Sequence, residues 1–446
     1  MDPLFTRNNN LPYILATNVW HGDQSVGHVN ILGLGRRSSI VTSIGCPDSE
    51  IVTPRLPQEL IDQIIDELST DLTELKTCSL VASAWAHRCR PYLFRTVSLF
   101  PCRYTVTEDR YSSRNLAPYV RRLRVFCGDR DEDELPVPRD NELTVSLLSC
   151  FPNVSQLEMH NMRWDNLRPE VRQYFLTGMK TITAMSMWDV KFHSFDDLLR
   201  LIHAFPYLNT LHLRQVQWDV DAEWTFSSDH VMQVGSRGIP ELRELMVYEA
   251  PSSSWFLSSL FHGHDTTCKR ELRRIGLDWG DGQDDDLSIL SNLVRASNSL
   301  HTFELDLSWH APLVPLDLSH NPHLRGIWLD GLLLDSPSSP TSLKKTWLPS
   351  LISSIVSPHV IQIVFYIFLG DTDGIRLLDL ERIDWTLSGP RFAELQNLGF
   401  IVTILPHPAW GLPSRAEVQG IIKKRMPIAN ARDILRFQTE DLLRTV

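Results

Sequence analysis

The feature that most constrains the fold is a short apolar pattern that recurs along most of the chain. It runs apolar, two residues, apolar, one residue, apolar, and its copies start 24 to 36 residues apart, a period typical of solenoids. The last two apolar positions lie two residues apart, so they face the same side of a strand. The eleven copies start at Phe94, Val120, Val154, Ile182, Leu208, Leu242, Leu272, Leu300, Leu324, Val360 and Leu395.

Helix-like segments lie between these predicted strands. The clearest is 194–205, where Ser194 and Asp197 form a capping box ahead of an apolar stripe. Similar segments are 143–151, 255–261, 287–294 and 348–356. A single strand and helix cannot bury their own apolar face, so stability must come from stacking one unit on the next.

This succession of strand, loop, helix and turn resembles the leucine-rich-repeat family over residues 94–402. The chain departs from the family pattern in that unit lengths vary and the asparagine that usually follows the strand is mostly missing. The resemblance implies an α/β fold, a degenerate leucine-rich-repeat-like solenoid whose strands form a concave sheet.

A different segment precedes the repeats. Pro57 stands where a first helical turn tolerates proline, and Asp71 with Glu74 forms a capping box for a second helix. A third helix is predicted to begin near Ser83. Three short helices bury little surface by themselves, so the segment has apolar surface left for a partner. The apolar stripe of the first helix consists of Leu60, Ile61, Ile64, Ile65 and Leu68.

Residues 54–97 resemble the F-box, the adaptor-binding module of cullin-type ubiquitin ligases. The resemblance rests on the opening Leu-Pro-x-Glu-Leu at Leu56, on Leu80-Val81 and on Trp85, in that order. It implies docking onto the Skp adaptor and, through it, onto a cullin. The alternative is that these helices cap the domain that follows, with the same residues facing inward. The implied adaptor-binding residues are Leu56, Pro57, Glu59, Leu60, Ile64, Ile65, Leu68, Leu80, Val81 and Trp85.

Composition narrows the class of partner. A net charge of −11 argues against a general nucleic-acid or anionic-membrane surface. Seven scattered cysteines without C-x-x-C spacing suit a reducing compartment. The most apolar run, 360–369, is about half the length that a membrane helix requires and predicts a buried strand. We therefore expect a soluble protein of the cytoplasm, the nucleus or both.

Catalytic motifs are missing from the sequence. It has no G-x-S-x-G, no Walker loop and no H-E-x-x-H, and its histidines lack metal-ligand spacing. An enzyme built on an α/β barrel is disfavoured because the repeats exceed eight. The prediction is a non-catalytic protein without cofactor or metal.

The recognition surface is predicted from strand alternation. Residues between the apolar anchors project from the opposite, concave face of the sheet. Their character changes from basic and mixed to acidic around 278–330, which favours a partner with basic character there. Aromatic residues and arginine among them are types common at binding hot spots. The candidates for target binding are Trp188, Arg214, Tyr248, Asp278, Asp306, Trp328, Asp330 and Tyr366.

The predicted organisation has four parts. These are a flexible leader at 1–53, the F-box at 54–97, the solenoid at 98–412 and a C-terminal helical cap and edge at 413–446. This order predicts a substrate-recognition subunit of a cullin-type (SCF) ubiquitin ligase complex that binds a target protein through its repeats. The alternative is a repeat-based protein-interaction scaffold that does not bind the adaptor.

Overall fold

A computed structural model describes most of the chain from Leu56 onward. The chain divides into two units, Met1–Leu56 and Pro57–Val446, and the predicted leader at 1–53 lies outside the described residues. The described residues are 56–99, 116–127, 143–219, 241–249, 256–257, 260, 271–278, 284–307, 316–334, 347–369, 372–404 and 414–440.

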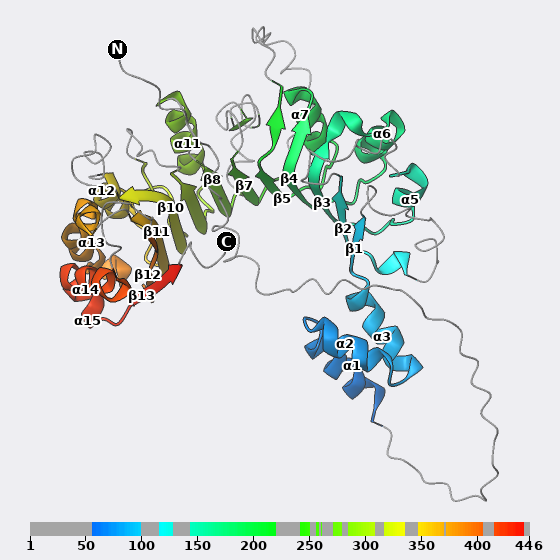
Figure 1. The fold of residues 1–446 in the computed structure, drawn as a ribbon, viewed down its shortest axis with the longest axis horizontal. Helices are drawn as coiled ribbons and strands as arrows, with labels where there is room; N and C mark the ends of the chain where they lie inside the picture. Colours follow the sequence, from blue (N-terminus) through cyan, green and yellow to red (C-terminus); the bar gives the residue numbers. More distant parts are fainter. Residues whose placement is uncertain are drawn as a thin grey trace, which may run out of the picture. The chain divides into compact units, whose positions relative to one another are not determined.

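Three helices, α1 (Gln58–Glu67), α2 (Leu72–Ser79) and α3 (Ser83–Leu93), form where the sequence predicts them (Figure 1). The side chain of Asp71 caps α2 by accepting hydrogen bonds from the N–H groups of Thr73 and Glu74, both at 3.0 Å. The helices share a small core separate from that of the repeats. Its buried members are Ile61, Ile65, Leu75, Cys78 and Cys89.

The strands of the described residues form one thirteen-stranded sheet in which every pair is parallel. Neighbours in the sheet follow one another in the sequence, except that the short β6 pairs with β4. The strands are β1 (Thr96–Leu99), β2 (Arg122–Phe126), β3 (Gln156–Arg163), β4 (Ala184–Phe192), β5 (Thr210–Arg214), β6 (Gln217–Trp218), β7 (Glu244–Tyr248), β8 (Arg274–Asp278), β9 (Thr302–Asp306), β10 (Gly326–Leu334), β11 (Gln362–Leu369), β12 (Asn397–Ile404) and β13 (Leu435–Glu440).

Each of the eleven apolar patterns contains or borders one strand of this sheet, so the predicted strand stack is confirmed. The strands of the main path lie in the sheet in the order of the sequence. Each repeat unit therefore adds one parallel strand beside the strand of the preceding unit, which makes an α/β solenoid. The strands β6 and β13 were not predicted individually, and β13 lies within the predicted C-terminal helical cap and edge at 413–446.

Helices lie along one face of the sheet (Figure 1). The predicted helix at 194–205 is confirmed as α7, and Ser194 caps it by accepting from the N–H of Asp197 at 3.3 Å. Segment 255–261 lies mostly outside the described residues, whereas α6 and α13 were not predicted. The helices are α5 (Val145–Ser149), α6 (Pro169–Thr177), α7 (Phe195–His203), α11 (Asp284–Ala296), α12 (Trp347–Ser354), α13 (Leu380–Leu387), α14 (Arg415–Arg425) and α15 (Pro427–Ala431), with 3-10 turns η1 (Ala117–Tyr119), η2 (Trp164–Asn166), η4 (Asp373–Leu378) and η5 (Pro390–Phe392).

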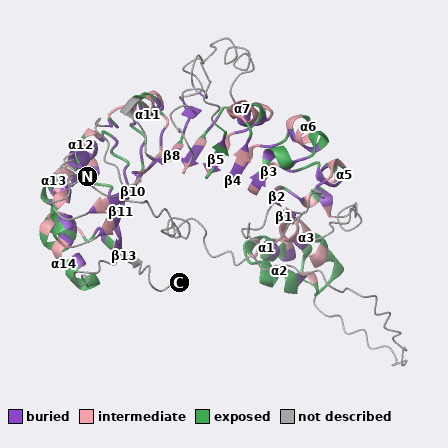
Figure 2. Ribbon diagram, turned by 45° about the horizontal axis from the view of Figure 1, so that its top comes forward, coloured by how far each residue is buried: buried purple, intermediate pink, exposed green. Residues whose placement is uncertain are grey.

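The main core lies between the sheet and these helices, where buried residues concentrate (Figure 2). The second apolar position of each pattern stands beside its counterpart on the next strand, as Leu123, Leu157 and Met185 do. The third position forms a parallel row that includes Val125, Met159 and Met187. A register slip of one residue would turn both rows out of the core, so the pattern fixes the register. Among the described residues, no helix has the length and apolarity needed to cross a membrane.

A left-handed residue recurs at the same place in several units. Asn161, Asp189, Gln215 and Glu249 have φ between 49° and 54°, and each stands one residue after an equivalent position in the sheet ladder. Gly331 follows the equivalent position in β10 with φ 72°. Asn161, Asp189 and Gly331 lie inside β3, β4 and β10, which continue to pair beyond them, whereas Gln215 and Glu249 directly follow β5 and β7. The varied residue types explain why the sequence did not reveal this repeated conformation.

We expect Asp189→Val to lower the free energy of unfolding by about 1–2 kcal/mol, because a β-branched residue is strained at positive φ. Asp189→Gly should leave stability nearly unchanged, since relief of strain offsets the larger entropy of the unfolded chain. Thermal unfolding of the two variants and the parent tests this. Equal melting temperatures for the Val and Gly variants would contradict it.

The C-terminal helices are joined by a buried carboxylate. Asp384 in α13 accepts hydrogen bonds from the N–H groups of Ile428 at 2.9 Å and Ala429 at 2.8 Å, and it is 3% exposed. These donors belong to the first turn of α15, where backbone N–H groups have no partner within the helix. Arg432 adds hydrogen bonds to the carbonyls of Leu387 and Phe392.

Asp384→Ala should cost about 2–4 kcal/mol, because two buried donors lose their acceptor. Hydrogen exchange at the amides of Ile428 and Ala429 should accelerate before that of the sheet. The matched control is Asp373→Ala, which removes a carboxylate that is more than half exposed. Unchanged exchange in the Asp384 variant would show that the two hydrogen bonds do not hold α15.

Candidate protein-interaction surfaces

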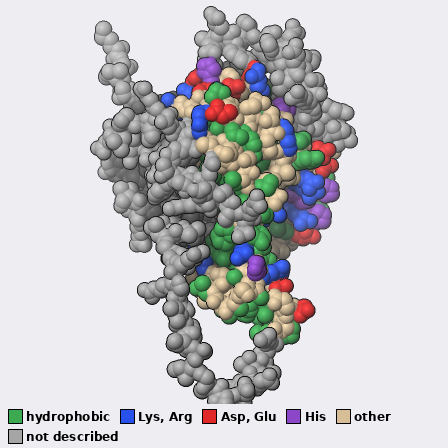
Figure 3. Space-filling view, turned by 90° about the vertical axis from the view of Figure 1, so that its right-hand side faces the viewer, with side chains coloured by type: hydrophobic (Ala, Val, Ile, Leu, Met, Phe, Trp, Pro, Cys, Tyr) green, Lys and Arg blue, Asp and Glu red, His purple; other side chains and the backbone are tan. Residues whose placement is uncertain are grey.

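The three-helix segment exposes an unusual amount of apolar side chain. Leu56, Leu60 and Ile64 are 53%, 46% and 40% exposed, and Leu80 and Val81 in the turn before α3 are 85% and 62% exposed. With Leu72, they are six of the ten large apolar side chains exposed among the described residues. Figure 3 shows hydrophobic side chains at the surface of this segment. We call Leu60, Ile64, Leu80 and Val81 the apolar patch.

Helical periodicity explains why α1 has two apolar faces. Ile61 and Ile65 lie one turn apart on the inner face and are buried, whereas Leu60 and Ile64 share the outer face. The inner face is satisfied by the helical core, and the outer face has no described cover. Exposed apolar surface bordered by polar residues is typical of sites for protein interaction.

The structure separates the predicted adaptor-binding residues into groups. Pro57 and Glu59 are exposed together with the apolar patch. Leu68 and Trp85 are half-buried and pack on the helical core. The structure corrects the expected exposure of Ile65: this side chain is fully buried, because its helical position places it over that core.

A polar cluster fixes α1 against α3. The carboxylate of Asp66 accepts from the guanidinium of Arg88 at 2.6 Å and from the hydroxyl of Tyr92 at 2.7 Å. The hydrogen bond from Tyr92, followed by that from Arg88, holds the pKa of Asp66 below its ordinary value. The partners lie 22 and 26 residues from Asp66 in sequence, a separation that carries no local signal, so sequence reasoning missed the cluster.

This cluster predicts an acid-sensitive contact. Since the pKa of Asp66 is lowered on folding, its stabilisation is present above the unfolded pKa of about 3.9 and is lost as pH falls through the lower folded value. We expect Tyr92→Phe to unfold at a higher pH than the parent during acid titration below about pH 4. Far-ultraviolet circular dichroism measures the midpoint, and Tyr119→Phe is the control. Coincident titrations would contradict the assignment.

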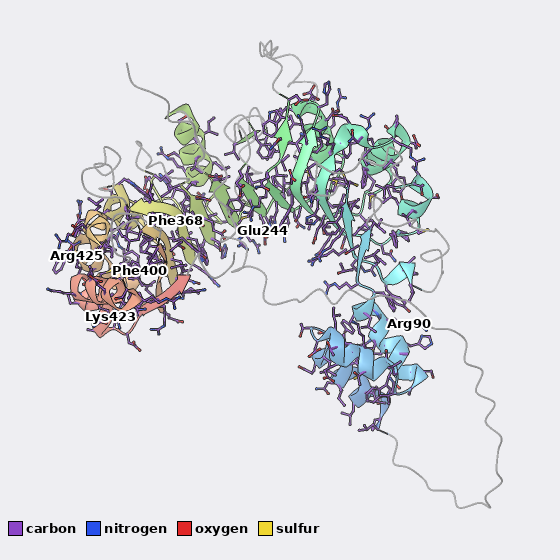
Figure 4. The ribbon with its side chains drawn as sticks, in the orientation of Figure 1. Arg90, Glu244, Phe368, Phe400, Lys423 and Arg425 are labelled. Carbon is purple, nitrogen blue, oxygen red and sulfur yellow. The ribbon has the colours of Figure 1, made fainter. Side chains whose placement is uncertain are left out.

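The second candidate surface is the face of the sheet opposite the helices, which we call the open face. Its outer row runs in register through Phe126, His160, Trp188, Arg214 and Tyr248 on five neighbouring strands, all of them partly exposed. Figure 4 shows side chains on both faces of the sheet and labels Glu244 on β7. The planar groups of the row are the side-chain types common in binding hot spots.

Stacking rigidifies the start of this row. The rings of Phe126 and His160 lie 4.4 Å apart and nearly parallel, and His160 lies 5.4 Å from Trp188. The guanidinium of Arg214 lies 6.0 Å from the centre of the Trp188 ring. Side chains already held in one rotamer lose little entropy when a partner binds. Trp188 and Arg214 were predicted as site residues, and the stack brings them together.

Carboxylates hold the arginines of this region. Glu158 lies 3.2 Å from Arg122 and 2.7 Å from Arg124, and Glu249 lies 2.9 Å from Arg214. Burial alone would raise the pKa of Glu158, but the hydrogen bond with His160 and the two arginines lower it below its ordinary value. Glu249 was not predicted as a site residue, because it follows the strand in a left-handed turn rather than alternating within it.

The centre of the open face is a connected polar network. Glu304 is 7% exposed, accepts from Arg274 at 2.7 Å and accepts from the hydroxyl of Tyr248 at 2.8 Å. Burial, followed by the charge of Glu304, raises the pKa of Tyr248 well above its ordinary value, so the phenol remains protonated. Tyr248 is thus held in place, and Glu304 is the group that holds it.

The predicted acidic residues lie at paired positions on adjacent strands. Asp278 pairs in register with Asp306, and Asp306 with Asp330. Asp278 needs a correction as a contact residue, because it is 7% exposed and accepts from the N–H of Glu249 at 2.9 Å, which fixes the preceding turn. Asp306 and Asp330 remain partly exposed. Among the described residues, no group of histidine, cysteine, aspartate and glutamate could hold a metal ion.

The two remaining aromatic candidates stand near the acidic rungs. Trp328 pairs in register with Glu304, and its ring covers Gly326, where an added Cβ would overlap it. Tyr366 on β11 has no register partner on β10, because the ladder between these strands shifts after Leu329. The structure therefore places Trp328 on the strand position beside Glu304 and leaves Tyr366 outside the ladder to β10.

No protein-family model matches the chain, and no curated protein matches it. Among solved structures, it is similar to Rad7 and Elc1 of yeast, crystallised as a complex, at 13% identity over 81% of this chain and 91% of that chain, with a TM-score of 0.37. It is similar to the leucine-rich repeat domain of APL1B at 10% identity over 70% and 83%, with a TM-score of 0.27. The match to TLR13 in complex with ssRNA13 has 11% identity and a TM-score of 0.29, and covers 64% of this chain but only 32% of that one. These likenesses identify neither a family nor a function.

Proposed function

We propose that this protein is the substrate-recognition subunit of a cullin-type (SCF) ubiquitin ligase complex. In this proposal α1–α3 bind the Skp adaptor and the open face of the sheet binds a target protein. The observation that supports it best is the apolar patch, which leaves Leu60, Ile64, Leu80 and Val81 exposed on helices that already have a core of their own.

Burial of the patch would supply part of the free energy of a docking contact. Complete burial of a leucine or isoleucine side chain is worth about 1.5–3 kcal/mol relative to full exposure, so these partly exposed residues together supply several kcal/mol. Association also costs translational and rotational freedom, and the cost is smaller when the surface is already ordered. Asp66, Arg88 and Tyr92 supply that order by fixing α1 against α3.

The open face supports the second half of the proposal. It presents stacked aromatic and guanidinium groups whose positions are fixed by register, stacking and ion pairs. The protein would perform no covalent step itself. It would raise the local concentration of the target's lysines near activated ubiquitin, which is catalysis by proximity carried out by other subunits. The expected location is the cytoplasm or nucleus.

A repeat-based scaffold that does not bind the adaptor is the second candidate. It would use the same open face, and the apolar patch would then serve another contact. The two functions differ in one measurable property, the affinity of α1–α3 for the adaptor.

We expect the full chain to capture purified Skp adaptor, and Leu60→Asp/Ile64→Asp to reduce capture at least tenfold. Two carboxylates in the stripe would have to be buried without partners on binding. The control is Thr73→Asp/Thr77→Asp, which places the same charges one turn apart on exposed positions of α2. If the parent and the Leu60/Ile64 variant captured equal amounts of the adaptor, the receptor function would be contradicted and the scaffold function would be favoured.

A further inference from the structure

Among the described residues, the last strand of the sheet, β13, has a neighbouring strand on one side only. It pairs with β12, where Leu398 donates its N–H to the carbonyl of Ile434 at 2.9 Å (Figure 1). The N–H of Leu435 belongs to the same trans peptide unit as that carbonyl and points the opposite way. Alternation along the strand gives the N–H of Phe437 the same direction. These groups therefore face the outer edge of the sheet.

An aromatic row of the core ends at this edge. Phe365, Phe400 and Phe437 stand in register on β11, β12 and β13, with ring centres 5.3 Å and 5.9 Å apart. The first two rings are buried, whereas that of Phe437 is partly exposed. A further strand beside β13 would continue the row and cover Phe437. Removal of this apolar surface from water favours the addition of such a strand.

Helix α14 brings a lysine to the edge. The ammonium of Lys423 lies 5.6 Å from the centre of the Phe437 ring, and the lysine side chain is exposed (Figure 4). Arg425 of the same helix pairs with Glu381 at 2.6 Å, so these two charges balance. Lys423 therefore places a positive charge beside the ring that a further strand would cover.

A second cation, Arg436, lies on β13 itself. Its guanidinium donates to the carbonyl of Leu435 at 3.0 Å and to that of Asp433 at 2.9 Å. The carboxylate of Asp433 is 3.7 Å away and almost fully exposed, so it offsets this charge only in part. An incoming strand would replace the guanidinium at the carbonyl of Leu435, and a carboxylate of that strand would then pair with Arg436.

These charges decide which partner fits the edge. Pairing of the β13 strands of two copies of the chain would place the Lys423 and Arg436 side chains of both copies along one edge, and like charges at opposed positions are unfavourable. A segment with carboxylates complements the same cations. Since β13 is six residues long, about 20 Å, a segment of about six residues covers it.

We infer that the outer edge of β13 binds an extended acidic segment of another protein, which adds to the sheet as a further strand. The backbone of the segment pairs with the outward groups of Leu435 and Phe437, and an apolar side chain packs on the Phe437 ring. Carboxylates of the segment pair with Lys423 and Arg436. The contact uses neither the apolar patch nor the aromatic row at Trp188, so it goes beyond the proposed function and does not depend on it.

The test is fluorescence anisotropy of the full-length protein with a labelled peptide that alternates apolar and polar residues around a central phenylalanine and carries two glutamates. In an extended peptide, alternate N–H groups point to opposite sides. Methylation of the backbone nitrogens that face β13 should therefore weaken binding at least tenfold, whereas methylation of the other alternate set should change it less than threefold. Equal effects of the two sets, or no binding of the unmethylated peptide above that of a shuffled one, would overturn the inference.

Two variants locate the contact. Phe437→Ala should weaken binding at least tenfold, because the phenylalanine of the peptide loses its neighbour. Lys423→Glu/Arg436→Glu should reverse the charge preference, so that a peptide with lysines in place of the glutamates binds more tightly, a result that loss of folding would not produce. The control, Lys76→Glu/Arg200→Glu, makes the same charge change at exposed positions of α2 and α7. An unchanged preference in the Lys423/Arg436 variant would overturn the assignment of the acidic segment to this edge.

Discussion

The structure depends on the burial of two apolar side chains per strand against a layer of helices. The rows through Leu157 and Met159 continue from strand to strand in fixed register, and each unit covers the apolar face of the one before it. On the other face of the sheet, the core does not restrict which side chains can occur. The sheet can therefore carry aromatic, basic and acidic groups at fixed spacing without loss of the core.

The sequence predicted the strands that recur in every repeat unit but not the contacts that occur in a single part of the chain. All eleven strands with the apolar pattern were predicted because alternation is a strong signal, and capping residues such as Ser194 marked helix starts. Contacts between residues far apart in sequence, such as Asp66 with Tyr92 and Asp384 with Ala429, have no such signal. Two candidate site residues, Ile65 and Asp278, had the right residue type in the right element but are buried, because burial depends on packing that the pattern does not specify.

The two candidate surfaces differ in their physical chemistry. The apolar patch on α1 and the turn before α3 consists of exposed hydrophobic side chains, which suit a stable contact with one constant partner. The open face is polar, and ion pairs hold its side chains in place, which suits selection among many segments of similar shape. A shared docking module joined to a selective repeat surface is the arrangement that the proposed receptor function requires.

Hydrogen–deuterium exchange of the full-length protein, with and without purified Skp adaptor, tests the central claim most directly. The account predicts slower exchange in α1 and around Leu80 and Val81 when the adaptor is present, with unchanged exchange in the strands of the sheet. Identical exchange of α1 in the two samples, with the adaptor at saturating concentration, would contradict it.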